Sequence, residues 1–163
     1  MKTTKRIRFI VQVAVIAAIY VTLTMLSGAL GLSSGIIQIR ISEALCILPI
    51  FTCAAVPGLF LGCLISNTLL GSIVVDIIFG SLATLLGAVF TRIFRQNFVA
   101  AALSPVVSNS LIIPFVLKYA YGFSGSVFFF MSTVAAGEVL SCCVLGYVLY
   151  KAFGRHSDIF KNC

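Results

Sequence analysis

The chain has 163 residues, of which 61% are hydrophobic and only 9% charged, and its mean hydropathy is +1.18. Soluble domains carry about 25% charged residues, so this composition excludes a water-exposed surface. It indicates an integral membrane protein made almost entirely of helices. The formal net charge is +7. The cations stand at the ends of apolar runs, which indicates membrane topology and contact with anionic lipids and argues against nucleic-acid binding.

The first apolar run predicts a membrane helix at about residues 8–28. It is too long for the core of a signal peptide and has no convincing Ala-x-Ala-like cleavage site after it; a cleaved signal peptide is the alternative. The preceding basic residues, with no acid among them, mark the N-terminus as cytoplasmic: Lys2, Lys5, Arg6 and Arg8.

Within this helix Ala14 and Ala18 lie one turn apart. A small-xxx-small pair lets the backbone of another helix approach closely. We therefore consider Ala14 and Ala18 a candidate subunit interface, with plain lipid-facing residues as the alternative.

The block of residues 41–70 is too long for one crossing. As a straight helix it would measure about 45 Å, against about 30 Å for the hydrocarbon core. Pro49 and Pro57 interrupt it, which predicts two shorter helices at about 41–54 and 57–71. Arg92 and Arg95 are expected in the cytoplasm, after a helix at about 72–92. The block therefore crosses twice, giving six spans, or forms a re-entrant pair, giving four; we predict six.

Two further helices are predicted at about 98–118 and 127–151, and the last is followed by a basic cytoplasmic tail containing Lys151, Arg155, His156 and Lys161. This topology leaves only Arg40 and Lys118 of the basic residues outside. We predict an all-α fold, a single membrane domain of residues 1–163 with six transmembrane helices and both termini in the cytoplasm. The expected location is the cell membrane, as a multi-pass protein.

Polar side chains in a hydrocarbon medium are costly and usually functional. Several are predicted to gather toward the outer face, with Glu138 of the last helix below them. Two or three carboxylates with one guanidinium suit a small molecule rich in donors, such as the N–H and NH2 edge of guanine. Asp76, Gly80 and Thr84 share one helical face. The predicted substrate-binding residues are Gln38, Arg40, Glu43, Asn67, Asp76, Asn109 and Glu138.

Each of these residues also has a structural interpretation. Arg40 would form an internal ion pair with one of the acids. Ser42 would cap the second helix and place Glu43 in its first turn, where an acid suits the helix dipole. Asn67 and Asn109 would form hydrogen bonds between neighbouring helices.

Enzyme activity is not expected. The chain has no G-x-x-x-x-G-K-[ST] motif for ATP, no histidine within the membrane for a Ser–His protease, and only one aspartate, Asp76, placed for an aspartyl protease. Neither a metal site nor a cofactor is expected, because five of the six cysteines lie inside apolar runs and none has the C-x-x-C spacing. An autonomous small secondary transporter for a purine-like or cationic small molecule, with Glu138 or Asp76 carrying a proton, is one function that these residues would allow.

The segments RISEAL, PGLF and DIIFGSLATLL, together with AAGEVL around Glu138, resemble the QueT family. The resemblance implies a substrate-binding S component of an energy-coupling factor (ECF) transporter with a six-helix bundle. It implies that Ala14 and Ala18 dock a transmembrane coupling subunit, which works with two ATPase subunits. The implied substrate is a queuosine precursor: a 7-deazaguanine base such as the aminomethyl or cyano precursor, or queuine. The loop from Gly28 to Arg40 would close over it.

Overall fold

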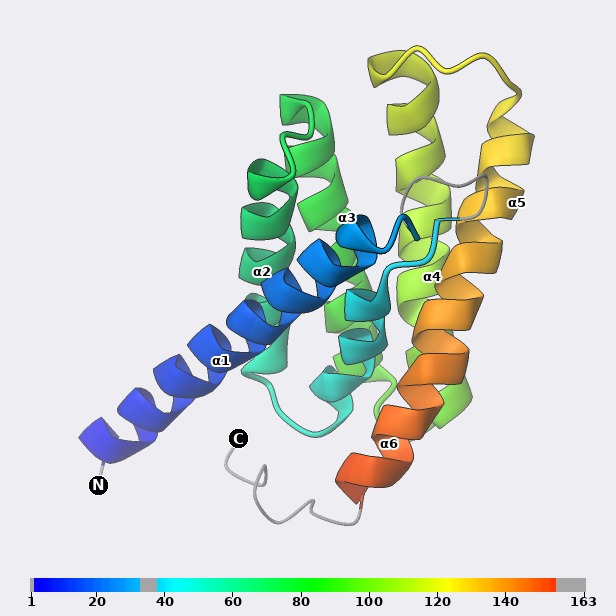
Figure 1. Ribbon diagram of the computed structural model, residues 1–163. Coiled ribbons are helices and arrows are strands. Elements are labelled where there is room, and N and C mark those ends of the chain that lie inside the picture. Colours follow the sequence, from blue (N-terminus) through cyan, green and yellow to red (C-terminus); the bar gives the residue numbers. More distant parts are fainter. Residues whose placement is uncertain (1, 33–37, 155–163) are drawn as a thin grey trace.

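The computed structural model describes residues 2–32 and 38–154, and all regular structure in these residues is helical. In Figure 1 the helices α2 and α3 form one antiparallel pair, α4 and α5 form another, and α1 lies obliquely across the bundle. The predicted all-α fold is confirmed. In chain order the elements are α1 (Lys2–Ala29), η1 (Ile41–Ile50), α2 (Ala55–Leu69), α3 (Val74–Ile93), α4 (Phe98–Phe115), η2 (Val116–Ala120), α5 (Val127–Glu138), η3 (Val139–Leu145) and α6 (Gly146–Gly154).

Four of the described helical stretches are long and apolar enough to cross a membrane: Thr3–Ala29, Val74–Ile93, Phe98–Ala120 and Val127–Gly154. The third joins α4 to the π-helical turn η2, and the fourth joins α5, the π-helical η3 and α6 into one rod. The elements η1 and α2 have 10 and 15 residues, and 15 residues of α-helix measure about 22 Å. Length and composition thus support four spans, and the six crossings stay a prediction.

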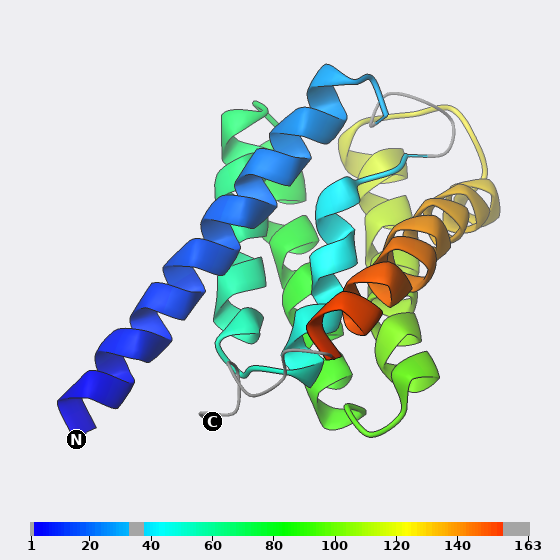
Figure 2. The same ribbon diagram turned by 60° about the horizontal axis from the view of Figure 1, so that its bottom comes forward.

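The short element η1 occupies the centre of the bundle. It contacts α1, α2, α3, α4, η3 and α6, and Figure 2 shows it between α1 and the α5–α6 rod. Every residue from Ser42 to Pro49 is buried. We predicted an α-helix to residue 54, which is wrong, because η1 is a 3-10 helix that contains Pro49 and ends at Ile50. Proline lacks the N–H that a continuing α-helix would use.

The start of η1 is held by α1. The Ile41 N–H donates to Ser27 Oγ at 2.9 Å, and Thr24 Oγ1 donates to Ser42 Oγ at 2.8 Å. The Ser42 side chain therefore does not cap η1, which corrects that interpretation. Glu43 does lie in the first turn of η1, as expected.

Glycines allow two close helix contacts. A Cβ atom at Gly62 of α2 would lie 2.8 Å from Tyr20 Cβ of α1, and one at Gly87 of α3 would lie 2.8 Å from Pro105 Cα of α4. Real side chains do not approach so closely, so the two glycines set the separation of these helix pairs.

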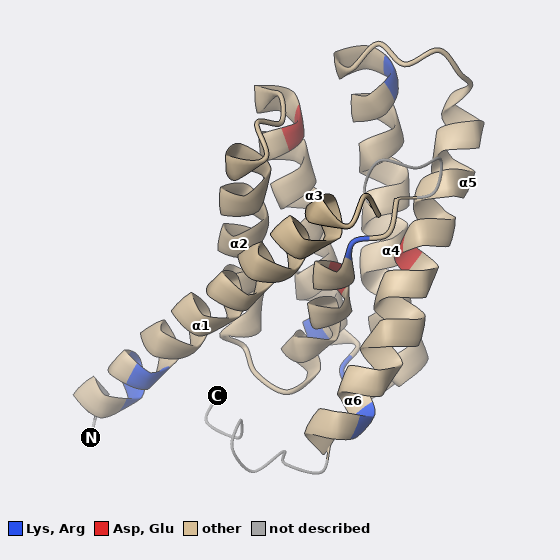
Figure 3. Ribbon diagram, viewed as in Figure 1, with Lys and Arg blue, Asp and Glu red and all other residues tan. Residues whose placement is uncertain are grey.

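Basic side chains gather at one end of the bundle. In the ribbon of Figure 3, basic residues lie on the first turns of α1, at the end of α3 and on α6, all near the same end. There, Arg92 Nη1 donates to the carbonyl oxygens of Pro49 at 3.0 Å and Ile50 at 3.2 Å. This arrangement agrees with the predicted cytoplasmic side. The tail residues Arg155, His156 and Lys161 lie outside the described residues.

Candidate substrate-binding site

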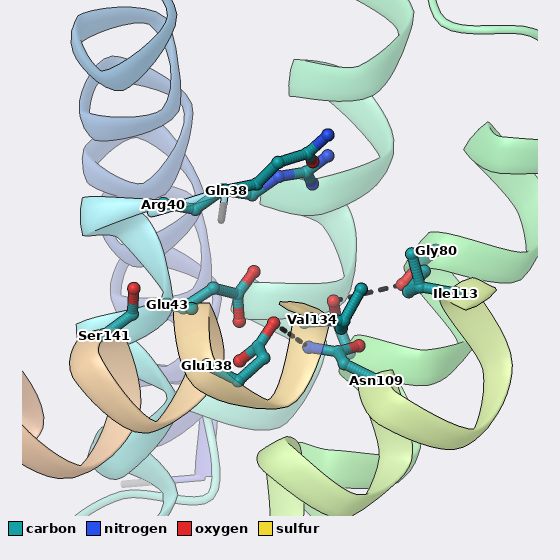
Figure 4. A pocket seen from close by; sticks show the side chains of 11 residues that line it. Gln38, Arg40, Glu43, Gly80, Asn109, Ile113, Val134, Glu138 and Ser141 are labelled. Atoms are coloured by element: carbon teal, nitrogen blue, oxygen red, sulfur yellow. Dashed lines mark hydrogen bonds between the residues drawn. The ribbon is translucent and has the colours of Figure 1, made fainter. Parts of the chain in front are cut away.

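The candidate site is a small cavity where the segment before η1 meets η1, α3, α4, α5 and η3. Its volume is about 40 Å³, well below the ~300–1,000 Å³ of typical ligand pockets, so a ligand would have to displace part of its wall. In Figure 4 Gln38 and Arg40 lie on one side and Asn109 and Glu138 on the other, with Glu43 between them. The lining residues are Gln38, Arg40, Glu43, Gly80, Thr84, Asn109, Ile113, Val134, Gly137, Glu138 and Ser141.

Most of the residues predicted for the site line this cavity. The structure brings together Gln38, Arg40, Glu43, Asn109 and Glu138 from three separate parts of the chain. A role in binding a substrate stays a prediction for each of them.

The two remaining predicted residues, Asn67 and Asp76, lie behind this wall. Arg40 Nη1 donates to Asn67 Oδ1 at 3.4 Å. A Cβ atom at Gly80 would lie 3.2 Å from Asn67 Nδ2 and 3.4 Å from Asp76 Oδ1, so both side chains approach the cavity where Gly80 lines it. Asn67 thus positions Arg40. Asp76 lies next to Gly80 and is not among the residues that line the cavity.

Asp76 also connects α3 to the end of the second helix pair. Its Oδ2 atom accepts a hydrogen bond from the Tyr121 hydroxyl at 2.9 Å. Burial, together with this bond, raises the pKa of Tyr121.

Within the described residues no Lys or Arg nitrogen lies within 4.0 Å of an acid oxygen, so the interpretation of Arg40 as an ion-pair partner is wrong there.

Glu43 is oriented by α1 and by its own helix. The Tyr20 hydroxyl donates to Glu43 Oε1, and the Cys46 thiol donates to Glu43 Oε2 at 3.0 Å. Tyr20 is 0% exposed and Glu43 is 2% exposed. Because helix α1 also carries Ala14 and Ala18, this contact joins the cavity to the candidate interface helix.

Glu138 is oriented by α4 and by the next turn of its own rod. Asn109 Nδ2 donates to Glu138 Oε1 at 2.7 Å, and the Cys142 thiol donates to Glu138 Oε2 at 3.2 Å. Asn109 therefore joins two helices, as one interpretation held, and lines the cavity as the other required.

Ligand atoms of Glu43, Cys46 and Cys142 lie within 4.8 Å of one another, a spacing that would admit a metal ion. The Cys46 thiol already donates a hydrogen bond to the Glu43 carboxylate, and the Cys142 thiol donates one to the Glu43 carbonyl oxygen at 3.4 Å. The expectation of no metal site stays a prediction.

Four lining residues were not found from the sequence: Ile113, Val134, Gly137 and Ser141. Gly137 lies against the Gln38 carbonyl oxygen so closely that a Cβ atom would overlap it. Ser141 is 1% exposed, and its Oγ atom has no hydrogen-bond partner in the described part of the chain. The signal for Ser141 was its spacing, because residues three apart share a helix face and Ser141 follows Glu138 by three. Nothing in the sequence pointed to Gly137, whose neighbour comes from a distant segment.

The sequence profile of the QueT transporter family matches residues 10–155. The chain belongs to the QueT transporter family. A relative in this family, the queuosine precursor transporter QueT of Lactococcus lactis subsp. cremoris (strain MG1363), is 39% identical over 93 residues. The alignment covers 55% of this chain and 54% of the relative, about half the length of each. No solved structure matches this family member.

Proposed function

We propose that this protein is the substrate-binding subunit, or S component, of an ATP-driven ECF importer in the cell membrane. It captures a queuosine precursor from outside, a 7-deazaguanine base such as the aminomethyl precursor or queuine. Family membership supports transport, and the similarity to the queuosine precursor transporter of L. lactis supports the substrate class. The observation that carries the proposal is the convergence of Glu43, Glu138, Asn109 and Arg40 on one cavity.

The chemistry of the wall fits such a base. A carboxylate accepts two parallel hydrogen bonds from the N–H and NH2 groups of a guanine edge. The amide of Asn109 and the side chain of Gln38 supply both donors and acceptors for the rest of the ring, and Ile113 and Val134 supply apolar contact for its faces. Because the cavity is small, the segment that holds Gln38 and Arg40 shifts when the base enters. Of the predicted closing loop, residues 33–37 lie outside the described residues, and its closing role stays a prediction.

The partners follow from the S-component role. Ala14 and Ala18 are both exposed on α1 while Ala17 between them is buried, so the small pair is free to receive the coupling subunit. Two separate ATPase subunits supply the energy, consistent with the lack of a P-loop motif in this chain. The coupled protein topples in the membrane and releases the base inside.

Binding by the purified protein tests the substrate. We expect the parent protein to bind aminomethyl-deazaguanine. Glu138→Ala is expected to lower the affinity at least about tenfold. Asp76→Ala is expected to lower it less, because Asp76 lies behind the cavity wall. Parent-like binding by both variants would contradict the proposed site.

Uptake into vesicles tests the mechanism against an autonomous secondary transporter. With the coupling subunit and ATPases present, import of labelled base requires ATP. Import by this chain alone, driven by a proton gradient, would favour the alternative, with Glu138 or Asp76 carrying the proton.

A further inference from the structure

The charged groups on the cavity wall do not balance. They are Arg40, Glu43 and Glu138. The Arg40 guanidinium donates to Asn67, and neither carboxylate has a Lys or Arg nitrogen within 4.0 Å in the described part of the chain. With the two acids ionised, the wall carries two negative charges against one positive charge.

Within the described residues, the hydrogen bonds that reach the two carboxylates come from neutral donors. Glu43 accepts from the Tyr20 hydroxyl and the Cys46 thiol. Glu138 accepts from the Asn109 amide and the Cys142 thiol. Neutral donors orient a carboxylate but leave its charge uncompensated, and in a medium of low dielectric an uncompensated charge is strongly unfavourable.

A second observation is independent of charge. The Ser141 hydroxyl lines the same cavity, beside Glu43 in Figure 4, is 1% exposed and has no hydrogen-bond partner among the residues that the structure describes. Buried polar atoms in native proteins nearly always have a partner. The wall therefore lacks both one positive charge and one polar partner, and a ligand supplies both.

We propose that the site selects a base with one positive charge, an ammonium group on the side arm, over a neutral base of the same shape. That the ligand is a deazaguanine base rests on the proposed function; the preference for charge rests on Arg40, Glu43 and Glu138. The ammonium forms a charge-assisted hydrogen bond to one carboxylate, which is shorter and stronger than a neutral one. The other carboxylate accepts the N–H and NH2 edge of the ring.

The test compares three 7-deazaguanines whose side arms differ: aminomethyl, ethyl and cyano. The ethyl arm matches the aminomethyl arm in size and lacks its charge. Calorimetry on the full chain in detergent is expected to show the aminomethyl base binding at least about tenfold tighter than the ethyl and cyano bases. This comparison uses the unaltered protein, so it does not depend on a variant that folds.

Variants then locate the effect. Glu43→Gln and Glu138→Gln keep the size of the side chain and remove its charge, and at least one of them is expected to bring the aminomethyl and ethyl affinities within about twofold of each other. Lys118→Gln, a charge removal on η2 away from the cavity wall, keeps the parent ratio.

The outcomes separate the two proposals. Equal affinity of the parent for the aminomethyl and ethyl bases, or an unchanged ratio in both folded glutamine variants, overturns the charge preference and leaves the proposed substrate class in place. Failure of all three bases to bind overturns the proposed substrate class, and the charge preference with it.

Discussion

Gly137 of α5 lies directly against the backbone carbonyl of Gln38, with no room for a Cβ atom between them. This contact supports the segment that carries Gln38 and Arg40 on the rod that carries Glu138. The Gln38 side of the cavity therefore packs against the Glu138 side through the contact between Gly137 and the Gln38 backbone.

Gly137→Ala tests this support. The added methyl group displaces the Gln38 segment, so we expect base affinity to fall at least about tenfold and the free energy of unfolding to fall by about 1–3 kcal/mol. Gly146→Ala on the same rod is the control, because a Cβ atom there would have its nearest neighbour at 3.7 Å. Calorimetric binding and thermal unfolding in detergent measure both effects. Equal behaviour of the two variants would contradict the role of Gly137.

Tyr20→Phe tests the hydrogen bond between α1 and the cavity. It removes the hydroxyl that donates to the buried Glu43, and loss of one partner of a buried charged group costs about 1–3 kcal/mol of stability. Tyr119→Phe is the control, because Tyr119 is 73% exposed and surface changes usually stay within about 0.5 kcal/mol. Thermal unfolding measures the difference, and a Tyr20→Phe midpoint equal to that of the control would rule the bond out as a stabilising contact.

Tyr121→Phe tests the connection between α3 and the loop that follows η2. Burial and the hydrogen bond to Asp76 raise the pKa of Tyr121 above its ordinary value, which is about 10. Since folding raises the pKa of Tyr121, the protonated phenol stabilises the folded protein. This contribution is complete below about pH 10 and is lost as the pH rises through the folded pKa. Ultraviolet titration of the parent minus the variant should show one phenol ionising above pH 10; ionisation at or below pH 10 would contradict the contact.

Ala14→Leu and Ala18→Leu test the proposed interface. Both positions are exposed on α1, so a larger side chain fits in the free protein but holds a partner helix away. We expect each variant to lose most of its co-purification with the coupling subunit and ATPases while it still binds the base. Ile19→Leu, at a neighbouring exposed position, should co-purify like the parent. Normal assembly of both alanine variants would move the interface elsewhere.

Properties set by short stretches of chain were predictable. The apolar runs indicated the class of protein and the approximate helices. The central block is divided, but Pro49 and Pro57 lie inside η1 and α2, and the break falls between them at residues 51–54. Glu43, Arg40 and Glu138 stood out because charged residues in apolar sequence need compensation. Ala14 and Ala18 were chosen from their spacing and from the family resemblance; both are exposed on α1, and their role as an interface stays a prediction.

What the sequence determined by itself was therefore the helical membrane fold and which polar residues need an explanation. The tertiary structure decided which hydrogen bonds they form: Asp76 with Tyr121, Ser42 with Thr24, and Asn109 with Glu138. It also decided that η1 is a buried 3-10 helix and that Gly137 must be glycine. The physical reason is that hydropathy and helical period are local, whereas hydrogen bonds and steric fit depend on distances between segments far apart in the chain.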